Sequence, residues 1–112
     1  RDCQVLSGSA FRTSGTTSRE SFQFTRGEPS YFDKTADSGA TRRMAFCGHC
    51  GSHLCSLPLD EDADFGFVSV RVATSDQFDQ LRPVAEIFCQ SRVAWLEDQE
   101  GMVQFRGMPV AT

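Results

Sequence analysis

Short runs in which hydrophobic and polar residues alternate follow one another along most of the chain. The clearest is FGFVSVRVA, at 65–73, where Val68, Val70 and Val72 recur with the period of two that a β-strand produces. The segment VAEIFC, at 84–89, predicts a further strand. Residues 41–46 and 53–57 flank a glycine-containing turn and predict the two strands of a hairpin.

Another hairpin is predicted over residues 21–33. Phe22 and Phe24 alternate with polar residues there, and a turn at Gly27 and Pro29 precedes two further aromatic residues. Strands joined by turns therefore account for most of the chain.

Helical signal is confined to two short segments. Ser75 is expected to be the N-cap of one or two helical turns over 75–81, and Pro83 prevents their continuation. DCQVL, at 2–6, predicts another short turn of helix. We therefore expect a mainly β fold in a single domain, residues 1–112, with the ten Phe residues and Trp95 supplying bulk to the core.

Composition narrows the classes of function. Hydrophobic residues make up 39% and charged residues 23% of the 112 residues, which is ordinary for a soluble globular protein. No hydrophobic run approaches the roughly 20 residues that span a bilayer, and no signal-peptide pattern is present. We therefore expect a cytoplasmic protein without a membrane partner. The net charge of −4 and the scattered basic residues argue against nucleic acid as a partner.

The cysteines indicate where chemistry is to be sought. Five is an odd number, which a closed disulfide framework does not use completely, and without a secretory signal we expect metal or thiol chemistry. In the C-x-x-C turn, Cys47 and Cys50 place two sulfurs at the separation that a tetrahedral zinc ion requires. We expect Gly48 and Gly51 to adopt left-handed backbone conformations, which turn N–H groups toward the thiolates.

Two other interpretations of this turn stay open. A redox C-x-x-C motif stands at the start of a helix, whereas the residues after Cys50 do not predict one; the alternative is a pair of buried cysteines without a ligand. A structural zinc site needs four ligands, and the turn supplies two. The other candidates in the chain are Cys3, His49, His53, Cys55 and Cys89. His53 and Cys55 share one face of the predicted strand, but a strand leaving the turn carries its side chains away from the metal.

The chain resembles the glutathione-dependent formaldehyde-activating enzymes, which share their domain with centromere protein V. Four segments carry the resemblance in the family's order: RDCQVLSGSAF (1–11), FQFTRGEPSYF (22–32), RMAFCGHCGSHL (43–54) and RPVAEIFCQSRVAWLE (82–97). Cys47 and Cys50 match the two ligand positions of the family's knuckle. Cys3 matches the last cysteine of its C-x-C-x-x-C cluster.

The resemblance implies a β-sandwich-like fold of short antiparallel strands with a zinc knuckle and two zinc sites. A structural site would pair Cys47 and Cys50 with an upstream C-x-C, and a catalytic site would use the cluster ending at Cys3 and keep one position open for a thiol. Measured against that pattern, the upstream cysteines are absent from the chain. We therefore expect about three dozen residues to precede Arg1 in the natural protein.

The function implied by the resemblance is a zinc-dependent carbon–sulfur lyase. Such an enzyme joins glutathione and formaldehyde to S-hydroxymethylglutathione, or acts on a related thiol–aldehyde adduct. Its expected metal ligands here are Cys3, Cys47 and Cys50. Ser7 and Ser9 would donate hydrogen bonds to the bound glutathione. Arg12 and Arg43 would meet its carboxylates.

The chain also departs from the family pattern. Where the closing strand of many relatives carries His and Trp, this chain has Glu86 and Phe88, and Cys55 and Cys89 are additional thiols that we expect to be buried structural groups. The alternative function is a non-catalytic, zinc-stabilised protein-binding module, as the link to centromere protein V allows. Such a module requires an exposed apolar or strongly charged patch.

Overall fold

A computed structural model describes residues 2–35, 39, 41–59 and 67–108. The chain divides into two compact units. We call Ser14–Asp76 the sheet unit, and Arg1–Thr13 together with Gln77–Thr112 the terminal unit. Among the described residues, no helix has the length and apolar character needed to cross a membrane.

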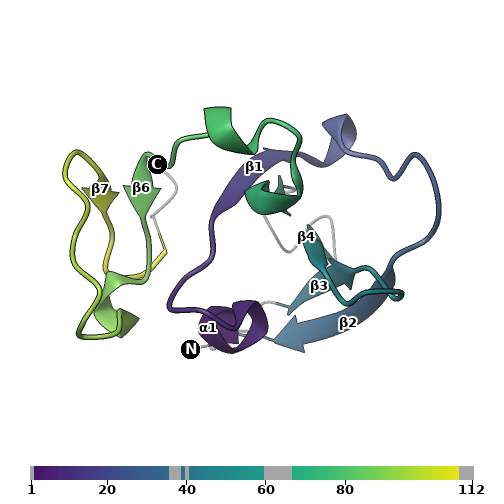
Figure 1. Cartoon of the computed structure of the whole chain (residues 1–112). Helices are drawn as coiled ribbons and strands as arrows, with labels where there is room; N and C mark the ends of the chain where they lie inside the picture. The colour runs from purple at the N-terminus through teal and green to yellow at the C-terminus, as the bar shows by residue number, and fades with distance from the viewer. Residues whose placement is uncertain (1, 36–38, 40, 60–66, 109–112) are drawn as a thin grey trace. The chain divides into compact units, whose positions relative to one another are not determined.

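The sheet unit is built on a five-stranded antiparallel sheet with the order β1-β5-β4-β3-β2. Its strands are β1 (Ser14–Ser18), β2 (Ser30–Thr35), β3 (Thr41–Phe46), β4 (His53–Pro58) and β5 (Phe67–Arg71) (Figure 1). A short 3₁₀ turn, η1 (Arg19–Ser21), follows β1. Strands β2 to β5 lie in chain order, and β1 pairs with β5 at the far edge. The prediction of a mainly β fold is confirmed. The β-sandwich-like packing of two sheets stays a prediction. The single domain over residues 1–112 also stays a prediction.

One face of the sheet carries a small buried core. Residues paired across antiparallel strands point to the same side, so the pairing of Cys55 with both Ala45 and Val70 gathers these side chains on one face. The core consists of Ala45, Cys55, Leu57 and Val68, with Phe22, Leu54 and Val70 packed against it.

The prediction that Phe residues and Trp95 fill the core is mostly wrong, since only Phe22 among them packs against the described core. None of the buried hydrophobic residues described is aromatic, and 72% of the Trp95 surface is exposed. Ala45, Cys55, Leu57 and Val68 occupy the inward positions of the central strands instead.

The opposite face of the sheet holds buried polar groups. Arg42 donates from Nη2 to the carbonyl and the hydroxyl oxygen of Ser56 and to the carbonyl of Phe67, at 3.0–3.1 Å, and its Cζ lies 4.4 Å from the Phe67 ring centroid. Arg71 donates to the hydroxyls of Ser14 and Ser69. These contacts join four strands on the side away from the hydrophobic core.

The hairpin predicted around the C-x-x-C turn is confirmed. Strands β3 and β4 pair antiparallel, with a register shift between Ala45 and Phe46. The hairpin predicted over 21–33 is wrong, because the residues before its turn form no strand and β2 pairs with β3 instead. The Phe22 and Phe24 rings contact each other edge-on at 5.1 Å, so their alternation reflects an aromatic pair rather than a strand.

The strand predicted over 65–73 is present in part. Strand β5 ends at Arg71, and a 3₁₀ turn, η2 (Val72–Thr74), follows it; residues 65–66 lie outside the described part. The prediction that Ser75 begins a helix is wrong. The Ser75 N–H donates to the Val72 carbonyl at 3.0 Å and so ends η2. The next 3₁₀ turn, η3 (Phe78–Gln80), begins after Gln77.

The terminal unit contains little regular structure. Helix α1 (Asp2–Ser7) confirms the turn predicted near the start. Strands β6 (Ala85–Glu86) and β7 (Val103–Gln104) form a parallel pair of two residues each (Figure 1). The strand predicted over 84–89 is therefore mostly wrong: Phe88 has a left-handed φ of 55°, and η4 (Cys89–Ser91) follows. A left-handed residue reverses the chain and ends the pairing.

Candidate functional site

The C-x-x-C segment forms a tight turn between β3 and β4. Two backbone hydrogen bonds close it: the Cys47 N–H donates to the Ser52 carbonyl at 2.8 Å, and the Gly51 N–H donates to the Cys47 carbonyl at 2.7 Å. Cys47 is half-buried and Cys50 is exposed. The structure thus brings these two predicted ligands together in one loop.

The two glycines of the turn have different roles. Gly51 has a φ of 80°, which confirms the predicted left-handed conformation. Gly48 does not have a positive φ, so the same prediction is wrong for it. A Cβ at Gly48 would overlap the hydroxyl oxygen of Ser30, the first residue of β2. A side chain at position 48 would therefore require the Ser30 hydroxyl to rotate away, since only that oxygen lies too close.

Hydrogen bonds within the turn favour the thiolate of Cys50. Its Sγ lies 3.2 Å from the Ser52 hydroxyl oxygen. The Ser52 hydroxyl and then the Ser52 backbone, with a smaller contribution from the Cys47 thiol, lower the pKa of Cys50. By contrast, burial raises the pKa of Cys55. Because thiolates rather than thiols bind metal, the turn is better suited to hold a cation than the core cysteine is.

Two residues after the turn, His53 and Cys55, are candidates for a third ligand, and both are packed against other side chains. His53 stacks on Phe46 at 6.2 Å between ring centroids and meets Phe32 edge-on at 6.1 Å. Cys55 is 2% exposed and packs in the core. The described residues contain no group of three or more His, Cys, Asp or Glu side chains that would hold a metal. The two thiols of the turn, Cys47 and Cys50, are of the type that zinc prefers and would supply two of its four ligands.

The segment expected to bind glutathione lies in the terminal unit. Cys3 is a half-buried residue of α1. The Ser7 hydroxyl accepts the Ser9 N–H at 3.2 Å and lies within 3.5 Å of the carbonyls of Gln4, Ser9 and Phe11. Ser7 therefore shapes the loop after α1, while the Ser9 side chain is exposed. Glutathione binding by Ser7 and Ser9 stays a prediction.

An ion-pair network surrounds Glu86. Arg92 donates to Glu86 at 2.7 Å, pairs with Asp98 and lies 3.2 Å from the Cys89 Sγ. Gln104 also donates to Glu86, at 3.0 Å. The Glu86 carboxylate thus has a structural role in joining β6 to β7.

Sequence reasoning missed two hydroxyl groups at the turn. Ser52 lowers the pKa of Cys50. In the sequence, this role is indicated only by a hydroxyl residue two positions after the second cysteine of the motif. Ser30 had no signal in the sequence, since its contact with the turn depends on the pairing of β2 with β3.

These features define a small, mainly β protein with a thiol-bearing hairpin turn. The family described as glutathione-dependent formaldehyde-activating enzyme matches residues 1–91, and the chain belongs to that family. The match includes the whole sheet unit together with Cys3, Cys47 and Cys50. Comparisons with curated proteins and with solved structures give no match.

The different roles of the two glycines predict different responses to alanine. Gly48→Ala should cost about 1 kcal/mol of unfolding free energy, because the Ser30 hydroxyl must rotate away from the new Cβ. Adding Ser30→Ala should recover most of that loss. Gly51→Ala should cost about 1–2 kcal/mol because of its left-handed backbone, and Ser30→Ala should not restore it. Urea unfolding of the variants measures these energies. Equal recovery of both glycine variants would show that the assigned roles are wrong.

The lowered pKa of Cys50 predicts a pH-dependent reactivity. Ser52→Ala should raise the pKa of Cys50 and slow its alkylation at pH 7 by about threefold or more, since less thiolate is present. The two rates should converge at high pH, where both thiols are ionised. Iodoacetamide labelling followed by peptide mass spectrometry measures each cysteine separately, and Ser91→Ala serves as the control. Identical pH profiles for Cys50 in both proteins would contradict the role of Ser52.

Proposed function

We propose that the protein is a carbon–sulfur lyase that joins the thiol of glutathione to formaldehyde or forms a related thiol–aldehyde adduct. The observation that carries the proposal is the family match over residues 1–91, which includes the three cysteines expected to bind metal. Its partners would be a small thiol and a small aldehyde. We also propose the family's β-sandwich-like arrangement for the complete fold.

Zinc is the metal that the thiol chemistry favours. Cys47 and Cys50 would hold it as two of the ligands of a structural site, and Cys3 would be one ligand of a catalytic site. When bound at an open site, zinc would keep a substrate thiol as the nucleophilic thiolate. The lowered pKa of Cys50 and the left-handed Gly51 support the structural half of this proposal. The free cysteines of the chain fit a reducing compartment such as the cytoplasm.

The residues around Cys3 would position the thiol substrate. The loop that the Ser7 hydroxyl shapes follows α1 directly, so its backbone and the exposed Ser9 hydroxyl lie a few residues from Cys3. Hydroxyl and backbone donors at such a distance suit a peptide substrate, which carries several hydrogen-bond acceptors. Arg12, one residue beyond Phe11, would supply the charge for a carboxylate.

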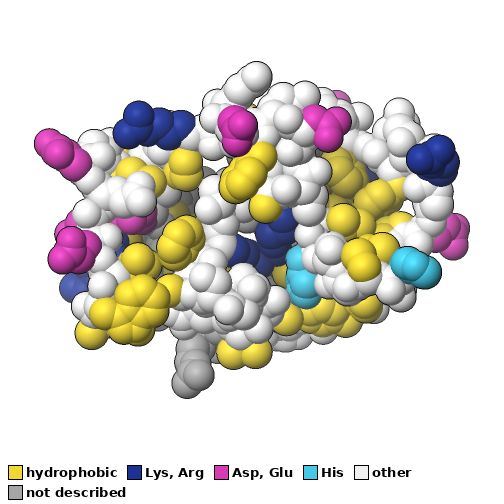
Figure 2. All heavy atoms as spheres, viewed as in Figure 1, with side chains coloured by type: hydrophobic (Ala, Val, Ile, Leu, Met, Phe, Trp, Pro, Cys, Tyr) yellow, Lys and Arg dark blue, Asp and Glu magenta, His cyan; other side chains and the backbone are white. Residues whose placement is uncertain are grey.

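A second candidate function is a zinc-stabilised protein-binding module. The terminal unit exposes several large hydrophobic side chains, and such side chains are visible on the surface in Figure 2. The most exposed of them are Val84 (76%), Trp95 (72%) and Val5 (67%). Exposed hydrophobic residues in such number favour an interaction surface.

The lyase proposal predicts a measurable change in the rate of adduct formation. Zinc-loaded protein should accelerate the formation of S-hydroxymethylglutathione from glutathione and ¹³C-formaldehyde, followed by exchange NMR. Cys3→Ser should lower the acceleration at least about tenfold, since it removes an expected metal ligand. Cys89→Ser, at a thiol outside the expected sites, should retain it. Full-length, zinc-loaded protein that neither binds glutathione nor changes the rate would refute the lyase.

The binding module makes the opposite prediction. The immobilised protein should capture a specific macromolecule, glutathione should not compete, and Trp95→Ala should weaken the capture. Capture that glutathione abolishes would count against this alternative.

A further inference from the structure

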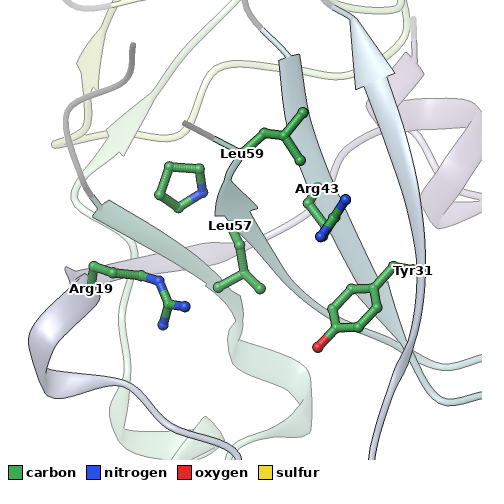
Figure 3. Close-up of a pocket in the computed structure, with 6 residues that line it drawn as sticks. Arg19, Tyr31, Arg43, Leu57 and Leu59 are labelled. Atoms are coloured by element: carbon green, nitrogen blue, oxygen red, sulfur yellow. The ribbon is translucent and has the colours of Figure 1, made fainter. Parts of the chain in front are cut away.

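The sheet unit contains a recess that the proposed chemistry of the cysteines does not use. It has a volume of about 270 Å³ and is lined by Arg19, Tyr31, Arg43, Leu57, Pro58 and Leu59. Figure 3 shows Leu57 lying between Arg19 and Tyr31, with Arg43 next to Tyr31. Arg43 precedes Cys47 by four residues, so at the rise of an extended strand the recess lies roughly 13 Å from the C-x-x-C turn.

One of the two arginines of the recess is already neutralised. Arg43 donates to both carboxylate oxygens of Asp33, at 2.9 and 3.3 Å. Its guanidinium carbon also lies 5.5 Å from the centroid of the Tyr31 ring. The hydrogen bonds to Asp33 and the contact with the Tyr31 ring position the Arg43 side chain on one side of the recess, and Asp33 balances its charge.

The other arginine leaves the recess with a surplus positive charge. Within the described part of the chain, the Arg19 guanidinium makes no hydrogen bond or ion pair. Among the described residues that line or contact the recess, two guanidinium groups and one carboxylate give a net charge of about +1, on a protein whose overall charge is −4. A local charge of this sign attracts a single anionic group.

The floor and rim of the recess are apolar. Leu57 and Pro58 are buried, and Leu59 is 43% exposed at its edge. The volume is slightly below the roughly 300 Å³ at which pockets for drug-sized ligands begin. The recess therefore suits a short aliphatic group, or one end of a longer molecule.

We propose that this recess binds a carboxylate that carries a short aliphatic chain. The Arg19 guanidinium would form the forked ion pair with the carboxylate, for which its planar donors are suited. The Tyr31 hydroxyl lies on the opposite side of Leu57 and would donate to the same group. Leu57, Pro58 and Leu59 would contact the aliphatic chain. The proposal does not rest on the lyase activity.

Titration of the full chain with 4-methylpentanoate tests the proposal, with the neutral 4-methylpentanamide as the matched ligand. The acid should shift the NMR signals of the Arg19 side chain and the Leu57 and Leu59 methyl groups, with a Kd on the order of 1 mM. The amide should bind at least about tenfold more weakly, because it lacks the charge. Equal binding of acid and amide, or shifts centred on other residues, would overturn the proposal.

Two variants separate the recess from general attraction between the protein and anions. Arg19→Gln should weaken binding of the acid at least about tenfold, because Gln retains hydrogen-bond donors without the charge. Arg26→Gln, at an exposed arginine outside the recess, should leave the affinity unchanged. Both side chains are exposed, so neither change should disturb the fold. Unchanged affinity in Arg19→Gln would overturn the proposal.

A competition experiment identifies the source of the carboxylate. If glutathione displaces 4-methylpentanoate from the recess, the site takes a carboxylate of the thiol substrate. If glutathione does not, the site takes a separate organic acid. Both outcomes support a carboxylate site. Full-length, zinc-loaded protein that binds the probe but does not accelerate adduct formation would refute the lyase and leave the recess intact.

Discussion

The antiparallel pairing of β3 with β4 is the constraint on which the rest of the sheet unit depends. The register that sets Ala45 opposite Cys55 decides which side chains enter the hydrophobic core and which face the polar side. The same pairing brings Cys47 and Ser52 together at the end of the hairpin, where backbone hydrogen bonds close the turn. A shift of one residue would move Cys55 out of the core and change the path of the chain between the two thiols.

Different chemistry is found along this one hairpin. At the turn, backbone hydrogen bonds close the loop, and the Ser52 hydroxyl favours the thiolate of Cys50. Four residues before the first thiol, Arg43 forms part of a recess with surplus positive charge and an apolar floor. On the other face, Arg42 and Arg71 bind carbonyl and hydroxyl groups of neighbouring strands. The polar face thus contributes to the connections between strands without supplying hydrophobic area.

Local pattern predicted some of these features and not others. The period of two in β5 and the glycine turn between β3 and β4 are local signals, and both elements are present. Phe22 and Phe24 show the same alternation, yet their rings pair with each other and no strand forms. Aromatic content also predicted a larger aromatic core than the described residues form, since Ala, Cys, Leu and Val side chains fill the inward positions on the central strands.

Only those features of the site that depend on residues close together in the sequence could be predicted. The pair of cysteines and the left-handed Gly51 followed from the motif. The close contact at Gly48 involves the hydroxyl of Ser30, eighteen residues earlier, and the recess combines residues from η1, β2, β3 and the end of β4. Such contacts depend on strand order, and no local spacing in the sequence encodes strand order.

The proposal on which the zinc chemistry depends is that Cys47 and Cys50 bind one zinc ion as a pair. Zinc K-edge X-ray absorption of the zinc-loaded protein tests it most directly, because the spectrum reports the type and distance of the metal's ligands. We predict a sulfur shell at about 2.3 Å that loses intensity in the Cys47→Ser/Cys50→Ser variant. A spectrum that the double variant leaves unchanged, or one with only nitrogen and oxygen ligands, would contradict the claim.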